Sequence, residues 1–170
     1  MRLALCSLFT LSLTSCGYHV SGKADLLPTR IKTIAIPAFG NTTHYYKVSE
    51  RVTSAITREF ISRTRYRIVA DPNQAEAILT GAVTNLIIYP TVYDPLTGRA
   101  AGAQVIVLLQ LSLTDRSNGA VLFSRPVFDV RERYEISVDA SKYFDENEPA
   151  MERLSRDVAR SVVSAILENF

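Results

Sequence analysis

Apolar and polar positions follow two different periods along the chain, and each period predicts a kind of element. From about residue 47 to 64, apolar side chains recur every three or four positions with charged residues between them, which predicts a one-sided helix. The same spacing returns after Pro149, a residue that the first helical turn tolerates, so a second helix is expected near the C-terminus. The two apolar stripes are Val48, Val52, Ala55, Ile56 and Phe60, and Met151, Leu154, Val158, Val162 and Ile166.

Strand patterns occupy the rest of the chain. Residues 31–39 and 66–70 are short apolar runs, and because the first helix connects them they can lie parallel. Runs 78–93 and 104–114 flank the turn-forming sequence DPLTGRAAG, which predicts an antiparallel hairpin with a long arm. Residues 120–136 predict a further strand, bent at Pro126. Its outward row is Asp129, Arg131, Arg133 and Glu135.

Together these elements predict an α+β fold. Two one-sided helices need a common apolar surface, so we expect them to pack on one face of a four- to five-stranded mixed, mostly antiparallel sheet. Residues 31–170 would form this single domain, a length that can bury an ordinary hydrophobic core. Residues 16–30 are polar and are interrupted by Gly22 and Pro28, which predicts a tether in front of the domain.

The N-terminus has the three-part layout of a secretory signal. Arg2 precedes an apolar run that ends in small residues, and the run is shorter than the roughly 20 apolar residues that a membrane-spanning helix needs. We therefore expect residues 1–15 to be a signal peptide. The sequence LTSC at 13–16 resembles the bacterial lipobox, which implies cleavage after Ser15 and acyl chains on Cys16. Several acyl chains together form a durable membrane anchor.

The residues beside this cysteine refine the expected location. Gly17 stands where an aspartate would be expected in a lipoprotein kept at the inner membrane, so the usual sorting pattern implies the periplasmic side of the outer membrane. The other cysteine, Cys6, lies in the signal, so the mature chain has no partner for a disulfide. Nineteen Lys and Arg residues against 17 Asp and Glu residues give no nucleic-acid character.

Candidate catalytic groups are scarce. His19 lies in the tether and His44 in a turn, and neither has a second ligand at metal-binding spacing. The sequence contains neither a phosphate-binding GxxxxGK loop nor a GxSxG nucleophile elbow. We therefore expect that the protein is not an enzyme and that it binds neither a metal nor another cofactor.

Four segments in order resemble the lipopolysaccharide-assembly lipoprotein family, LptE: CGYHV at 16–20, IAIPAFGNTT at 34–43, REFISRTRYRIV at 58–69 and AEAILTGAV at 75–83. The resemblance implies a domain that plugs the lumen of an LptD-type outer-membrane β-barrel and assists its assembly. It also implies binding of lipopolysaccharide during delivery to the outer leaflet. A plug meets a polar lumen wall, and the mixed charges of the last strand suit such a wall.

One segment leaves a second reading open. The sequence IAIPAFGN also resembles the opening strand of other periplasmic lipoproteins, those related to CsgG and to the activators of penicillin-binding proteins. That reading implies a lipoprotein that activates a peptidoglycan synthase. Such a regulator usually needs a long tether, whereas about 15 residues span at most roughly 50 Å, so the tether favours the plug.

The predicted hairpin tip offers a candidate lipopolysaccharide site. Lipid A carries phosphates, which arginine can grip with two N–H groups at once, and acyl chains, which need apolar or aromatic neighbours. The stretch YPTVYDPLTGRAAG supplies Arg99 together with Tyr89 and Tyr93. The alternative is a plain solvated turn in which the arginine only aids solubility.

Overall fold

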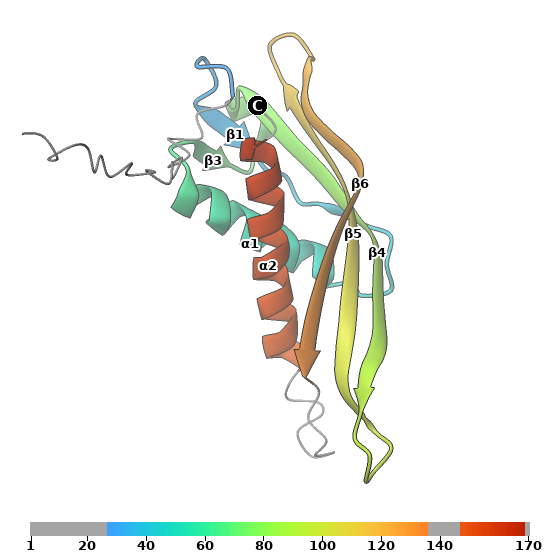
Figure 1. Cartoon of the computed structure of the whole chain (residues 1–170). Coiled ribbons are helices and arrows are strands. Elements are labelled where there is room, and N and C mark those ends of the chain that lie inside the picture. The colour runs from blue at the N-terminus through green and yellow to red at the C-terminus, as the bar shows by residue number, and fades with distance from the viewer. Residues whose placement is uncertain (1–26, 136–146, 169–170) are drawn as a thin grey trace, which may run out of the picture.

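The computed structural model describes residues 27–135 and 147–168 (Figure 1). The predicted signal peptide, Cys16 and most of the predicted tether lie outside these residues. The described elements are β1 (Thr33–Ala35), β2 (Gly40–Asn41), α1 (Val48–Arg63), β3 (Arg67–Val69), the 3₁₀ turn η1 (Pro72–Gln74), β4 (Ala77–Tyr93), β5 (Ala100–Asp115), β6 (Val121–Glu135) and α2 (Asn147–Glu168).

The strands form one mixed sheet in the order β3-β1-β4-β5-β6, with β2 pairing separately to β4. Strand β1 runs parallel to both β3 and β4, whereas β4, β5 and β6 are antiparallel. Figure 1 shows both helices on the same side of the sheet. The predicted α+β class is therefore confirmed, and so is the parallel pairing across α1. Strand β2 was not predicted, because Gly40 and Asn41 look like turn residues and only their pairing with Ala82 and Val83 makes them a strand.

The hydrophobic core lies between the helices and the sheet. All five residues of the predicted stripe on α1 are buried, and on α2 four are buried while Met151 is half-buried. Every second residue of β5 from Val105 to Leu113 is buried, so its odd-numbered side chains face the helices. The ring of Phe39 lies over Gly81, where a Cβ atom would come within 2.5 Å of Phe39 Cε2. The close approach of this ring therefore requires glycine.

The core also includes residues before the predicted domain boundary. Leu27 is 3% exposed and belongs to the core cluster, and the backbone N–H of Ile31 donates to the carbonyl of Pro28 at 2.8 Å. The last residues of the expected tether are thus seated on the domain.

The hairpin of β4 and β5 is longer than the sequence predicted. Strand β5 begins at Ala100, four residues before the expected Gln104, because Gly102 leaves room for the side chain of Val92 on the opposite strand. Beyond Leu86 the side chains of β4 are exposed, and the tip of the hairpin lies at the end of the molecule opposite β1 and β3 (Figure 1). At about 3.3 Å per residue, β4 spans roughly 55 Å.

The last strand bends where the sequence predicted it. Leu109 pairs with Phe128 and Leu111 with Arg125, so an extra residue is inserted opposite Gln110, at Pro126 and Val127. Proline is tolerated here because β6 is an edge strand. The outward side chains of Asp129, Arg131 and Arg133 are exposed, and the side chain of Glu135 lies outside the described part.

Candidate functional site

The tip of the β4–β5 hairpin is closed by an ordered turn. The carboxylate of Asp94 accepts hydrogen bonds from the backbone N–H of Leu96 at 3.0 Å, from that of Thr97 at 2.7 Å and from the Thr97 hydroxyl at 2.9 Å. These bonds, those from Thr97 above all, lower the pKa of Asp94. Gly98 completes the turn at φ +66°, a conformation that glycine adopts without strain. The Asp94 carboxylate is therefore held by hydrogen bonds within the turn.

The three predicted contact residues lie on this tip and are exposed. Tyr89 is 39% and Tyr93 59% exposed, and Leu96 at the turn is 93% exposed. Tyr89 lies opposite Gln104, to which its hydroxyl donates, and Tyr93 lies opposite Ala100. Gln104 is an even-numbered position of β5, so Tyr89 lies on the face of the hairpin that the helices leave uncovered. Register shifts between Pro90 and Tyr93 interrupt this alternation of faces before it reaches Tyr93.

The cation of the tip is free to meet a ligand. Arg99 is exposed, and within the described residues its guanidinium has no hydrogen-bond or ion-pair partner. The tip thus presents two phenol rings, an aliphatic side chain and a cation. This set can bind an amphipathic anion.

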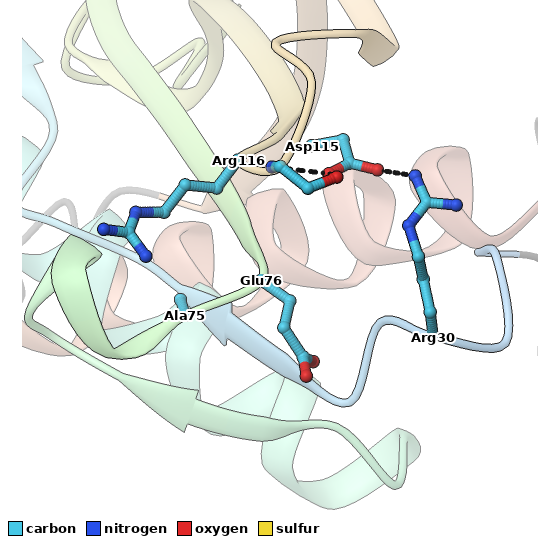
Figure 2. Close-up of a pocket in the computed structure, with 6 residues that line it drawn as sticks. Arg30, Ala75, Glu76, Asp115 and Arg116 are labelled. Atoms are coloured by element: carbon cyan, nitrogen blue, oxygen red, sulfur yellow. Dashed lines mark hydrogen bonds and ion pairs between the residues drawn. The ribbon is translucent and has the colours of Figure 1, made fainter.

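A second polar site lies at the opposite end of the sheet, where the chain enters the domain. It is a hollow of about 370 Å³ lined by Arg30, Ala75, Glu76, Asp115, Arg116 and Ser117. Figure 2 shows the side chains of Arg30 and Arg116 on opposite sides of Glu76, with Asp115 above it.

Asp115 is the buried anion of this site. It is 1% exposed, and its carboxylate accepts from the backbone N–H of Ser117 at 2.9 Å, from the Ser117 hydroxyl at 2.6 Å and from Arg30. The Asp115 N–H donates to the carbonyl of Ala120 at 2.8 Å, which closes the β5–β6 turn. The Arg30–Asp115 ion pair thereby joins the entering chain to that turn.

Glu76 binds the entering chain from the other side. Its carboxylate accepts from the backbone N–H groups of Lys32 and Thr33, at 2.9 Å for the latter, and these bonds lower its pKa. The Arg116 N–H donates to the Glu76 carbonyl at 2.8 Å. This cluster was not predicted from the sequence. Asp115 gave only a turn signal, and no local pattern relates it to Arg30, 85 residues away.

Neither a metal-binding cluster nor a membrane-spanning helix occurs among the described residues. Among them, no group of three or more His, Cys, Asp or Glu residues could hold a metal ion, and His44 is exposed in its turn. None of the helices in the described part is long and apolar enough to cross a membrane.

Solved structures that share this fold include bacterial lipoproteins. The rare lipoprotein B of Shewanella oneidensis superposes with a TM-score of 0.50 at 14% identity, over 81% of this chain and 95% of that one. Lipoprotein B of Nitrosomonas europaea superposes with a TM-score of 0.51 at 16% identity, over 81% and 85%. A hypothetical protein of Chlamydia trachomatis gives 0.56 at 11% identity, over 79% and 95%. At these identities the likeness concerns the fold.

The sequence shows the family to which the chain belongs. The model of the LptE family, described as lipopolysaccharide-assembly, matches residues 31–166. The chain therefore belongs to the LptE family, as the resemblance of its four segments implied. No curated protein sequence gives a significant match.

Proposed function

We propose that this chain is an outer-membrane lipoprotein, held at the periplasmic side through Cys16, that plugs an LptD-type β-barrel and assists its assembly. In this role it binds lipopolysaccharide on its way to the outer leaflet and performs no catalysis. The observation that carries the proposal is the family match, which spans nearly the whole described domain.

The outward face of β6 suits a partner with a polar wall. The outward row of β6 carries both negative and positive side chains, and the Asp129 carboxylate accepts from Arg131 Nε at 2.9 Å. The lumen of an outer-membrane barrel is polar, so a plug needs charged and hydrogen-bonding side chains on its outside rather than a broad apolar patch. Copurification tests this part: the chain should bring down an outer-membrane barrel. Recovery of a penicillin-binding protein in its place would support the peptidoglycan-synthase regulator and overturn the plug.

Anchoring depends on one sulfur atom. Cys16→Ala should leave an uncleaved or soluble periplasmic product, because the acyl chains that hold a lipoprotein in the bilayer have no other acceptor here. Fractionation in cells that lack the barrel partner removes any indirect retention. If the variant still sediments with the outer membrane in those cells, Cys16 is not the anchor.

Lipopolysaccharide binding is assigned to the hairpin tip. Because Arg99 is exposed and unpaired within the described part, Arg99→Glu should weaken lipopolysaccharide binding by the purified chain and leave its melting temperature and barrel association unchanged. Arg156→Glu, an equal charge change on the exposed face of α2, is the control. Unchanged binding in Arg99→Glu, or an equal loss in both variants, would exclude the tip.

A further inference from the structure

The end of the domain where the chain enters carries a group of exposed cations. We call it the entry surface, and it consists of Arg30, Lys32, Arg65, Arg67 and Arg116, all exposed. These residues come from the entering segment, from the connection between α1 and β3, from β3 itself and from the β5–β6 turn.

Several contacts show that these cations share one surface. Lys32 and Arg65 line the same hollow beside Leu27, and Arg30 and Arg116 line the neighbouring hollow around Glu76. The backbone N–H of Arg67 donates to the Lys32 carbonyl at 2.8 Å. Glu76 thus lies between the two hollows, with cations on both sides.

The acids within this surface are already engaged. Glu76 accepts from two backbone N–H groups, and Asp115 is buried against Arg30 and Ser117. Exposed Glu168 lies at the C-terminal end of α2, which reaches the same end of the molecule (Figure 1). Five cations against these three acids leave the entry surface positive. The side chains of Arg65, Arg67 and Arg116 make no hydrogen bond or ion pair within the described residues.

The chain in front of the domain leads directly from this surface toward the expected anchor. Leu27 is seated in the core at the entry surface, and the eleven residues from Cys16 to Leu26 reach at most about 40 Å. An acylated Cys16 would therefore hold this end near the bilayer. The hairpin tip lies at the other end of the molecule (Figure 1).

We propose that the entry surface docks on the anionic phospholipid headgroups of the leaflet that holds the lipid anchor. The orientation rests on the proposed anchoring at Cys16, and the docking concerns the anchored chain before it joins a barrel. Each Lys or Arg close to an anionic membrane surface strengthens binding by about fivefold, and arginine can also grip a phosphate with two N–H groups. Docking at this end directs the long hairpin away from the headgroup layer.

The helix layer supplies a matched control. Arg153 and Arg156 are exposed on the outer face of α2, around a hollow that also contains Glu59 and Asp157. Within the described part their side chains make no hydrogen bond or ion pair either. Reversing these two charges therefore changes the net charge as much as reversing two charges of the entry surface, at a place that the tether does not bring to the bilayer.

The test uses the chain from Gly17 onward, which keeps every described element and lacks the anchor. It is floated with phosphatidylcholine vesicles that either contain or lack phosphatidylglycerol, at low and at high salt. We expect binding only to the anionic vesicles, and we expect high salt to abolish it because salt screens exposed charges. The double variant Arg65→Glu/Arg116→Glu should lose at least about twentyfold in vesicle partition, and Arg153→Glu/Arg156→Glu less than about twofold.

Three results would overturn the proposal: no binding of the parent chain to the anionic vesicles, an equal loss in both double variants, or binding only when lipopolysaccharide is added to the vesicles. Melting temperatures of both variants show whether the fold is intact. Because this chain lacks Cys16 and no barrel is present, a failure here leaves the anchor and the plug standing. If the Cys16→Ala fractionation test fails, there is no longer a reason to expect that the anchor turns the entry surface toward the bilayer. The binding of the chain to anionic vesicles is still measured independently.

Discussion

Removing the carboxylate of Asp115 tests whether the entering chain is fastened to the sheet as the structure shows. Asp115→Ala deletes two hydrogen bonds from Ser117 to a buried charged acceptor, worth about 1.5 kcal/mol each. The contact with Arg30 adds only about 0.5 kcal/mol, because the Arg30 side chain is 54% exposed and water screens it. Relief of the buried charge returns about 1 kcal/mol, so we expect a net loss of roughly 2–3 kcal/mol.

Urea denaturation of the chain from Gly17 measures this loss directly. A domain of this size loses about 3 °C of melting temperature per kcal/mol, so the thermal midpoint should fall by roughly 6–9 °C. Arg116→Ala, next along the chain but exposed and without a side-chain hydrogen bond within the described residues, should stay within about 0.5 kcal/mol of the parent.

Arg30 provides the second arm of the same experiment. Arg30→Ala leaves the Asp115 carboxylate buried with only Ser117 as partner, so it should cost more than the ion pair contributes. The Arg30→Ala/Asp115→Ala double variant should be no less stable than Asp115→Ala alone, since no charge is then stranded. A loss below about 1 kcal/mol in Asp115→Ala, or strictly additive losses in the double variant, would refute this account.

Two further predictions concern the core and one half-buried acid. Val158→Asp or Leu111→Asp puts an unpaired charge into the core and should cost several kcal/mol, against little change for Arg156→Asp on the exposed face; equal melting losses would contradict the helix packing. Burial, and then the charge of Asp157, raises the pKa of Glu132, so ionised Glu132 destabilises the fold. Glu132→Gln should therefore melt higher than the parent at neutral pH, and the two should converge in acid; a constant difference at every pH would contradict this.

Local periodicity determined the elements that need no distant partner to be recognised. The stripe from Val48 to Phe60 and the stripe from Met151 to Ile166 each predicted a helix with one buried face, because a spacing of three or four residues puts apolar side chains on one side. The turn sequence between Tyr93 and Gln104 predicted the hairpin and placed Arg99 at its tip. The helix between the first two strands predicted that they lie parallel, and the hairpin predicted antiparallel strands, so a mixed sheet was expected.

Only the tertiary structure shows which residues far apart in the sequence contact one another. Gly40 and Asn41 become a strand because β4 offers them a free edge, and β5 starts early because Gly102 accommodates Val92. Leu27 reads as part of a polar tether until the core covers it. Local sequence patterns therefore do not predict the number of strands or the residue at which the domain starts.

The two polar sites differ in the same respect: the sequence predicts one of them, and only the fold assembles the other. Arg99 and the two tyrosines of the tip lie within eleven consecutive residues, so the sequence alone brought them together as a candidate site. The Arg30–Asp115 pair joins residues 85 positions apart, and the entry surface collects cations from four separate segments. In the linear sequence these cations are two close pairs, Arg30 with Lys32 and Arg65 with Arg67, and the separate Arg116, among nearly balanced charges. They form one positive surface only because the parallel strands β3, β1 and β4 begin at the same edge of the sheet and the β5–β6 turn returns to that edge.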